Sequence, residues 1–212
     1  MKASLPNTAF EQALADQYGL HYVAGLDEAG RGALAGPVVA AAVILPLADG
    51  ERMGELTAVN DSKQLSAKKR TDLYNLIVQH TLAYGIGSGS AQEIDDDGII
   101  PATKRAMRRA LAQLEPQAEG LVIDGRIRLA TVNLPQQSII RGDSKSLSIA
   151  AASILAKVTR DRHMIDLDSR FPLFNFPQHK GYGTEAHRGA IAKYGPTPIH
   201  RYTFAPIRQP LL

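Results

Sequence analysis

The sequence contains no cysteine, which excludes disulfide bonds and thiolate-bound zinc sites. It has no apolar run close to the roughly 18–20 residues that a membrane-spanning helix needs. Residues 1–18 include Glu11 and Asp16 and lack the apolar core of a signal peptide, so we expect a cytoplasmic protein. Internal repeats, low-complexity segments and zinc-like histidine spacings are also absent. What remains is a chain of 212 residues with 44% hydrophobic content, which is typical of one ordinary globular domain.

Positive charge is unevenly distributed along the chain. Residues 1–100 contain 7 Lys and Arg against 13 Asp and Glu, a balance of −6, whereas residues 101–212 contain 17 against 8, a balance of +9. A basic second half is typical of a protein with a polyanionic partner, and the acids of the first half are available for a cation. A solvated basic surface explains the same numbers, so the composition leaves both interpretations open.

A glycine-rich stretch follows the first predicted strand. It contains Asp27 and Glu28, then Gly30, Arg31 and Gly32. Adjacent residues on a strand point to opposite faces, so the two carboxylates share one site only if the strand bends there. The glycines allow that bend, and the guanidinium with nearby backbone N–H groups suits a phosphate. We therefore predict acids for a metal beside donors for a phosphate; the alternative is a turn with a surface salt bridge between Glu28 and Arg31.

Two further aspartates follow predicted strands. Asp124 ends the apolar run that begins at Leu121 and is followed by Gly125, which indicates a buried strand with a carboxylate at its carboxyl end. Asp-Gly is also a common hairpin turn without any function. Asp143 precedes a long predicted helix, where it is either a fourth acid of the site or only a charge that favours the positive helix end.

Hydrophobic periodicity and turn residues predict mixed α/β structure. The expected elements are a helix at 10–19, a hairpin of strands at 21–28 and 36–46, a loop at 46–60, a helix at 66–80 with Ser66 as N-cap, a strand at 81–90, a helix at 101–114, strands at 121–124 and 136–140, and helices at 146–169 and 184–193.

Three groups of charged and aromatic residues remain to be interpreted. We interpret Asp95, Asp96 and Asp97 as a solvated cluster at a helix start, because their spacing does not match a calcium loop. Basic residues line one side of the 101–114 helix and are either solvated or in contact with nucleic acid: Lys104, Arg105, Arg108 and Arg109. Aromatic and basic residues alternate after residue 171, a composition that suits nucleic-acid sugars and bases; they include Phe174, Phe176, His179, Lys180 and Tyr182.

Six short motifs, taken in order, resemble one known family. They are Asp-Glu-Ala-Gly-Arg-Gly at 27–32, Asp-Ser-Lys at 61–63, Asp-Gly at 124–125, Gly-Asp-Ser at 142–144, Ala-Ala-Ser-Ile-Leu-Ala-Lys-Val at 151–158 and His-Lys-Gly-Tyr-Gly at 179–183. Together they resemble bacterial ribonuclease HII, the type 2 ribonuclease H family, over roughly residues 21–207. One departure is Gly98, where the family often has asparagine, and it affects only a local helix cap.

The resemblance implies a ribonuclease H-like α/β fold, with a mixed, mainly five-stranded sheet flanked by helices. Residues 1–20 would be an N-terminal extension and 21–212 the catalytic domain, with a C-terminal helical part over about 171–212. It also implies endonucleolytic cleavage of RNA in RNA–DNA hybrids and 5′ of single ribonucleotides in duplex DNA, leaving 3′-hydroxyl and 5′-phosphate ends. The family precedent favours a monomer.

Site residues are carried over from the matching motifs. The catalytic and metal-binding carboxylates would be Asp27, Glu28, Asp124 and Asp143, and the substrate-binding residues would be Gly30, Arg31, Gly32 and Tyr182. The glycine-flanked arginine would grip the backbone at the RNA–DNA junction, and the tyrosine would pack on the deoxyribose that follows the ribonucleotide. Carboxylates without thiolates suit Mg²⁺ or Mn²⁺, and two such ions can activate water and neutralise phosphate charge.

Other functions stay open at this point. Ribonuclease HIII also cuts hybrids, a non-catalytic hybrid-binding module would share the basic surface, and a small-molecule phosphohydrolase would share the acids. The tail at 209–212, Gln-Pro-Leu-Leu, can dock on a sliding clamp or simply be a disordered end.

Overall fold

The computed structural model describes residues 5–59 and 66–208. Its elements are α1 (Ala9–Tyr18), β1 (Val23–Ala29), β2 (Val38–Ile44), α2 (Gly50–Glu55), η1 (Leu56–Ala58), α3 (Ala67–His80), β3 (Ala83–Gly89), α4 (Ala91–Asp97), α5 (Ile99–Leu111), β4 (Gly120–Asp124), β5 (Gln136–Ile139), η3 (Gly142–Ser144), α6 (Leu147–Asp168), α7 (Phe176–His179) and α8 (Glu185–Tyr194). The Asp-Ser-Lys motif at 61–63 and the tail at 209–212 lie outside the described residues. Within the described part, no helix combines the length and apolarity needed to cross a membrane.

One mixed sheet organises the chain, with the strand order β3-β2-β1-β4-β5. β1, β2 and β3 form an antiparallel meander, whereas β4 runs parallel to both β1 and β5. The register pairs Leu26 of β1 with Ile123 of β4. The next residues, Asp27 and Asp124, therefore lie at the same end of two neighbouring parallel strands, where sites of α/β sheets form. This confirms the predicted five-stranded α/β fold.

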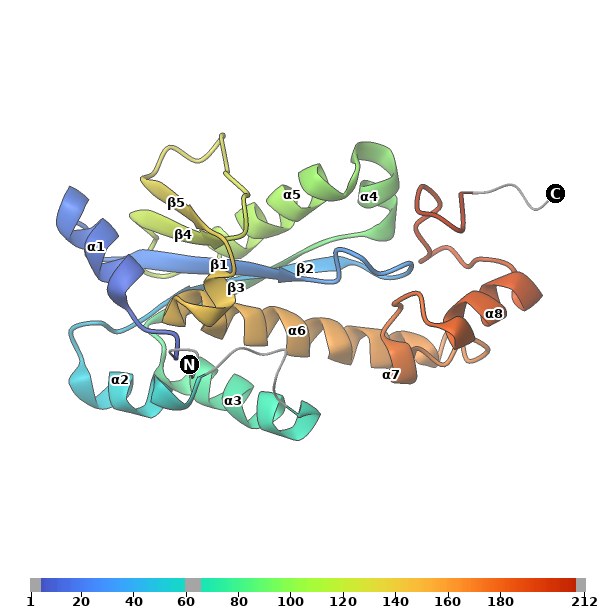
Figure 1. Ribbon diagram of the computed structural model, residues 1–212, viewed down its shortest axis with the longest axis horizontal. Helices are drawn as coiled ribbons and strands as arrows, with labels where there is room; N and C mark the ends of the chain where they lie inside the picture. The colour runs from blue at the N-terminus through green and yellow to red at the C-terminus, as the bar shows by residue number, and fades with distance from the viewer. Residues whose placement is uncertain (1–4, 60–65, 209–212) are drawn as a thin grey trace.

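Helices cover both faces of the sheet (Figure 1). β2 is buried along its whole length, and its alternate residues pack in opposite directions. Ala40 and Ala42 belong to the core that includes Met107 of α5, whereas Ala41 and Val43 belong to the core with α6 and α3. The sheet is thus a middle layer between α5 on one side and α6 with α3 on the other.

Glycines let the helices approach the sheet closely. A Cβ atom at Gly85 would lie 2.1 Å from the carbonyl oxygen of Ala110, and one at Gly87 would lie 2.2 Å from that of Ala106. Both carbonyls belong to α5, so side chains at these positions of β3 would push the helix away. These two glycines of β3 are therefore packing positions.

The structure corrects two local predictions. The predicted loop at 46–60 contains α2, whose N-cap Asp49 accepts a hydrogen bond from the N–H of Arg52 at 3.1 Å. None of the residues of α2 is buried, so the sequence shows no helical periodicity there. The acidic run Asp95–Asp97 ends α4 and does not cap α5; Asp95 accepts hydrogen bonds from the loop after α8.

Candidate active site

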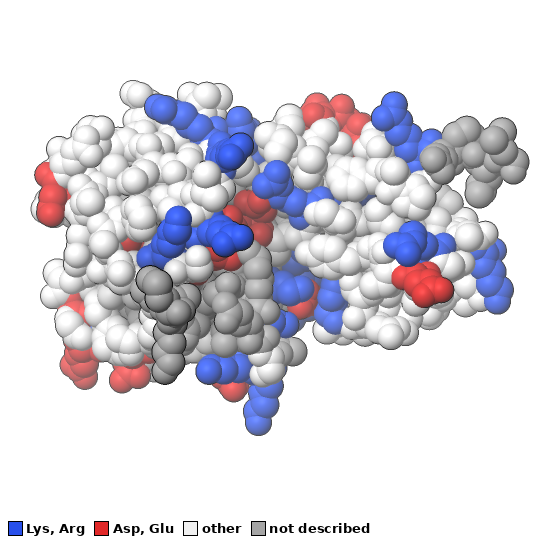
Figure 2. Space-filling view, viewed as in Figure 1, with Lys and Arg blue, Asp and Glu red and all other residues white. Residues whose placement is uncertain are grey.

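Acidic residues of β1 and glycines of the turn that follows it meet Asp124 of β4 in one pocket of about 440 Å³. The pocket is lined by Asp27, Glu28, Ala29, Gly30, Arg31, Gly32, Arg70, Asp124, Ser153, Lys157 and Tyr182. Figure 2 shows acidic side chains near the middle of this face of the molecule, with Lys and Arg side chains around them. Seven of the eight predicted site residues, all except Asp143, are therefore among those lining one pocket.

Asp27 is a buried acid of this pocket with a perturbed pKa. The residue is 5% exposed, and burial raises its pKa well above the ordinary value. The negative charges of Glu28 and Asp124 raise it further, while hydrogen bonds from Ser153 and from the N–H of Glu28 oppose the shift. The backbone bond to Asp27 Oδ1 is 2.7 Å long. The three acids are thus close enough to repel one another.

The other two acids of the pocket have their own partners. Glu28 Oε1 accepts a hydrogen bond from Arg31 Nη1 at 2.9 Å, and Asp124 Oδ1 accepts one from the N–H of Gly142 at 2.6 Å. The predicted alternative of a Glu28–Arg31 salt bridge is therefore real, and both of its residues line the pocket. Across the described residues, no three His, Asp or Glu side chains are arranged as a ready metal site.

The donor set nevertheless fits a divalent cation. Carboxylate oxygens are the ligands that Mg²⁺ and Mn²⁺ prefer. Burial is the main cause of the raised pKa of Asp27, and the charges of Glu28 and Asp124 add to it; a divalent cation would offset that repulsion. Asp27, Glu28 and Asp124 are the residues that could hold it.

Asp143 lies beside this group without lining the pocket. It is 3% exposed and belongs to η3, directly after Gly142, whose N–H binds Asp124. η3 leads into α6, whose N-cap is Ser146, so Asp143 is positioned by a short helical turn before the helix. Its role as a fourth acid stays a prediction.

Gly30, in the turn after β1, cannot be replaced without strain. Gly30 has a φ of 91°, and a Cβ atom there would lie 2.0 Å from Nε of Arg160. At Gly32 a Cβ atom would meet nothing within 4 Å, so this position leaves open space beside Arg31. The turn thus combines a fixed bend with room for a ligand.

Two buried arginines hold this turn, and neither was identified from the sequence. Arg201 Nη1 donates to the carbonyl of Arg31 at 2.8 Å, and its Nη2 donates to the carbonyl of Gly30 at 2.7 Å. Arg160 donates to the carbonyls of Pro37 and Ala35 at 2.9 and 3.0 Å. Both are 0% exposed, and burial lowers the pKa of Arg201 to about 9. The cations act as clamps on backbone carbonyls.

Cations also flank the aromatic ring of the pocket. Arg160 Cζ lies 5.3 Å and Lys157 Nζ 5.7 Å from the centre of the Tyr182 ring. Lys157, Ser153 and Arg70 line the pocket but were not predicted as site residues. Residues 153 and 157 do fall in the matched motif at 151–158, and their spacing of four places them on one face of α6.

The loop that carries Tyr182 rests on a chain of histidines with one consistent tautomer. The N–H of Thr197 donates to His200 Nδ1 at 2.9 Å, so the proton of His200 must be on Nε2. That proton faces His187 Nε2 at 3.1 Å, which leaves His187 Nδ1–H to donate to the Tyr182 carbonyl at 3.0 Å. Only neutral rings satisfy these bonds, because an added proton would place two N–H groups face to face.

We expect the chain of histidines to make the stability of the protein depend on pH. Burial lowers the pKa of His187 and of His200 to about 4, so the unfolded chain binds more protons than the folded one below pH 6.5. Between pH 6.5 and pH 5 the free energy of unfolding should therefore fall by about 1–2 kcal/mol for each of these histidines that titrates separately. Urea unfolding of wild type, His187→Gln and the exposed control His21→Gln measures it.

The slope of the free energy of unfolding against pH distinguishes titration of the buried histidines from a general loss of stability. His187→Gln should flatten the slope, whereas His21→Gln should keep the wild-type slope. Equal slopes in all three proteins would show that the buried histidines do not titrate as described.

The expectation that the aromatic residues after residue 171 suit contact with nucleic acid is wrong for Phe174 and Phe176. Phe174 is 5% exposed and Phe176 is 0% exposed, and both belong to the core between the end of α6 and α8. Their rings stack on each other with centroids 5.6 Å apart. They cannot reach bases, because they fill the interior on which the Tyr182 loop rests.

The sequence of this chain is similar to those of known proteins. The family model described as Ribonuclease HII matches residues 24–207. A curated relative named Ribonuclease HII, from Syntrophotalea carbinolica, is 54% identical over 200 residues, which cover 94% of this chain and 92% of that protein.

Two solved structures share the fold. The ribonuclease H2 from Pyrococcus horikoshii has a TM-score of 0.74 at 26% identity, covering 89% of this chain and 96% of that one. The ribonuclease HII in a structure described as a PCNA complex from Archaeoglobus fulgidus has a TM-score of 0.72 at 27% identity, covering 87% of this chain and 95% of that one.

Proposed function

This chain belongs to the ribonuclease HII family and is a nuclease of the ribonuclease H type, and from that premise we propose that it cuts RNA–DNA hybrids and duplex DNA on the 5′ side of a ribonucleotide. The observation that carries the proposal is the single pocket shared by three acids, the Gly30–Gly32 turn and Tyr182. Acids alone suit any phosphohydrolase, whereas a glycine turn and an aromatic ring beside them suit a sugar–phosphate backbone.

The acids are proposed to hold Mg²⁺ or Mn²⁺. Asp27, Glu28 and Asp124 supply the oxygen ligands, with Asp143 as the fourth. When bound, a pair of divalent ions supplies an activated water and neutralises charge on the phosphate, leaving 3′-hydroxyl and 5′-phosphate ends. Asp27 is kept in place by the N–H of Glu28 and by Ser153, and Asp124 is kept in place by the N–H of Gly142. These bonds orient the carboxylates before substrate arrives.

Selectivity is proposed to depend on the 2′-hydroxyl, the group that distinguishes RNA from DNA. Backbone groups of Gly30, Arg31 and Gly32 are the proposed partners of that hydroxyl, in the space left open at Gly32. The clamp by Arg201 fixes the carbonyls of this turn, so the donors and acceptors are held in advance. Tyr182 then packs on the next sugar, which lacks the hydroxyl.

Tyr182→Ala is expected to weaken cleavage at a lone ribonucleotide about tenfold and cleavage of a continuous hybrid less than threefold, because aromatic stacking contributes about 1–3 kcal/mol per contact. Single-turnover rates on the two substrates measure the difference. Tyr84→Ala, on the exposed side of β3, is the matched control and should leave both rates unchanged. Equal losses on both substrates would contradict the junction role.

One assay tests the proposed function against its alternatives. A duplex with a single ribonucleotide, a hybrid with a continuous RNA strand and a simple nucleotide ester are incubated with Mg²⁺ or Mn²⁺. The proposal predicts cleavage of the first two and none of the third. Cleavage of the continuous hybrid alone would favour activity of the ribonuclease HIII kind, and cleavage of the ester alone would favour a small-molecule phosphohydrolase.

Docking on a sliding clamp is a separate proposal. The archaeal structure compared above is described as a complex with PCNA, which concerns that protein. In this chain the corresponding proposal depends on the tail at 209–212, outside the described residues. A pull-down of wild type and of a chain ending at residue 208 with purified clamp tests it, and equal retention would remove the tail from the proposal.

A further inference from the structure

A second pocket, of about 310 Å³, adjoins the proposed active site through a shared residue, Arg31. We name it the basic pocket; it is lined by Arg31, Ile100, Lys104, Arg126, Ile127 and Arg128. Three segments far apart in the sequence build it: the turn after β1, the first half of α5 and the segment after β4. Four of its six lining residues are cations.

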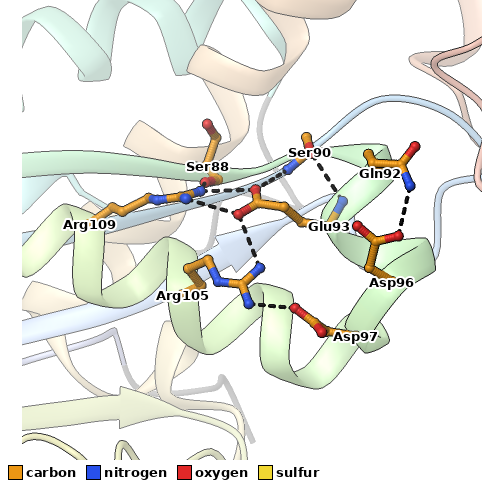
Figure 3. Close-up of polar contacts among 8 residues, drawn as sticks. All are labelled: Ser88, Ser90, Gln92, Glu93, Asp96, Asp97, Arg105 and Arg109. Carbon is orange, nitrogen blue, oxygen red and sulfur yellow. Dashed lines mark hydrogen bonds and ion pairs between the residues drawn. The ribbon is translucent and has the colours of Figure 1, made fainter.

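The charges of α5 are divided between two faces of the helix. Arg109 Nη2 binds Glu93 Oε1 at 2.9 Å, and Arg105 binds both Glu93 and Asp97 (Figure 3). The bond from Arg109 and the other contacts lower the pKa of Glu93 to about 2. α4 thus neutralises the positive charge on one face of α5.

The face that includes Lys104 has no such neutralisation. Among the described residues, no acidic side chain forms an ion pair with Lys104, Arg126 or Arg128. Arg31 alone in the basic pocket has an acidic partner, Glu28. Cations gathered without acids repel one another, so the pocket favours an anion.

Two arginines of the basic pocket, Arg126 and Arg128, belong to a segment whose backbone is anchored. Ile127 is 6% exposed and Leu129 is 0% exposed, whereas Arg126 and Arg128 alternate with them on the outside. The carbonyl of Ile127 accepts a bond from Ser138 Oγ at 2.6 Å, and the N–H of Leu129 donates to Gln136 at 3.0 Å. Because β5 holds this segment in place, the two guanidinium groups are presented from fixed positions.

We propose that the basic pocket binds backbone phosphates of the duplex beside the cleaved linkage, an inference that rests on the proposed function. Guanidinium groups match phosphate geometry and remain charged at neutral pH. The pocket shares Arg31 with the active site, so the bound phosphates lie within about five base pairs of the cut, at a rise of about 3.4 Å per pair. The contact contributes affinity and register without reading sequence.

The first test neutralises Arg126 and Arg128 together. Arg126→Gln with Arg128→Gln should raise the half-saturating duplex concentration in single-turnover cleavage about tenfold, with the loss in affinity rather than in maximal rate. The slope of log affinity against log salt should decrease in magnitude by about 2, close to 0.9 for each lost contact. Lys193→Gln with Arg208→Gln removes two exposed charges elsewhere and is the control. Equal changes in both double variants would overturn the proposal.

The second test locates the phosphates. Neutral methylphosphonate linkages are placed one at a time along each strand, and affinity is followed by fluorescence anisotropy of the labelled duplex. The affinity of wild type should fall at least threefold when the neutral linkage is at one or two positions within about five base pairs of the cut. The affinity of the Arg126/Arg128 variant should not fall further at those positions. The same losses in both proteins would contradict the assignment. Anisotropy requires no cleavage, so this failure differs from failure of the proposed function, in which wild type would not cut.

Discussion

Asp27→Asn is expected to lower the rate of hybrid cleavage by about 10³-fold or more, while the duplex still binds within about threefold of wild type. The amide would remove one of the proposed negative metal ligands, and loss of about 4 kcal/mol of transition-state stabilisation corresponds to that factor. We expect affinity to be retained because the proposed complex places a substrate phosphate beside Asp27, and removing a negative charge there does not repel the phosphate. Asp124→Asn should behave alike, since its amide oxygen can still accept the bond from Gly142.

Single-turnover cleavage and anisotropy with the same labelled duplex separate rate from binding. Asp96→Asn is the matched control, because Asp96 is exposed and accepts a hydrogen bond from Gln92 on the same helix. It should cleave at the wild-type rate. Near-normal turnover of Asp27→Asn would remove the metal assignment.

Arg201→Lys is expected to reduce the free energy of unfolding by about 3 kcal/mol. The same substitution should also lower the rate of cleavage. The guanidinium donates to carbonyls of Gly30, Arg31 and Gly36 from a position with no solvent exposure. A lysine ammonium cannot reproduce this planar fork, and each buried carbonyl left without a donor costs about 1–3 kcal/mol. The turn that is proposed to hold the 2′-hydroxyl would lose its support.

Urea unfolding at pH 7 measures this effect. Arg208→Lys is the control, since Arg208 is exposed and lies on the same C-terminal segment. A change in Arg201→Lys no larger than in the control would show that the clamp does not stabilise the turn.

The acids and the sheet could be predicted because local patterns specify them. An apolar run that ends in Asp124 is a strand with a carboxylate at its end, and the parallel register with β1 brings that end beside Asp27. The glycine turn after β1 was equally readable from Gly30 and Gly32. Each of these features depends on a few consecutive residues and on the period of one strand.

The hydrogen bonds from Arg160 and Arg201 to the turn could not be predicted, because they depend on contacts between distant segments. Arg201 bonds to backbone carbonyls 165 to 171 residues earlier in the chain, and no periodic pattern marks it. The same reason explains the error at Phe174 and Phe176: aromatic residues in an irregular segment resemble a stacking surface until the fold shows that they are buried. Backbone carbonyls carry no sequence signal, so their partners appear only in the folded chain.

The most direct measurement of the central claim locates the cation without relying on activity. Fe²⁺ is bound in place of Mg²⁺, ascorbate and peroxide are added, and the sites of hydroxyl-radical cleavage in the protein backbone are mapped. The account predicts fragments that end near residues 27–28, 124 and 142–143 and that disappear in Asp27→Asn. Fragments only around the acidic run Asp95–Asp97, or unchanged fragments in Asp27→Asn, would contradict it.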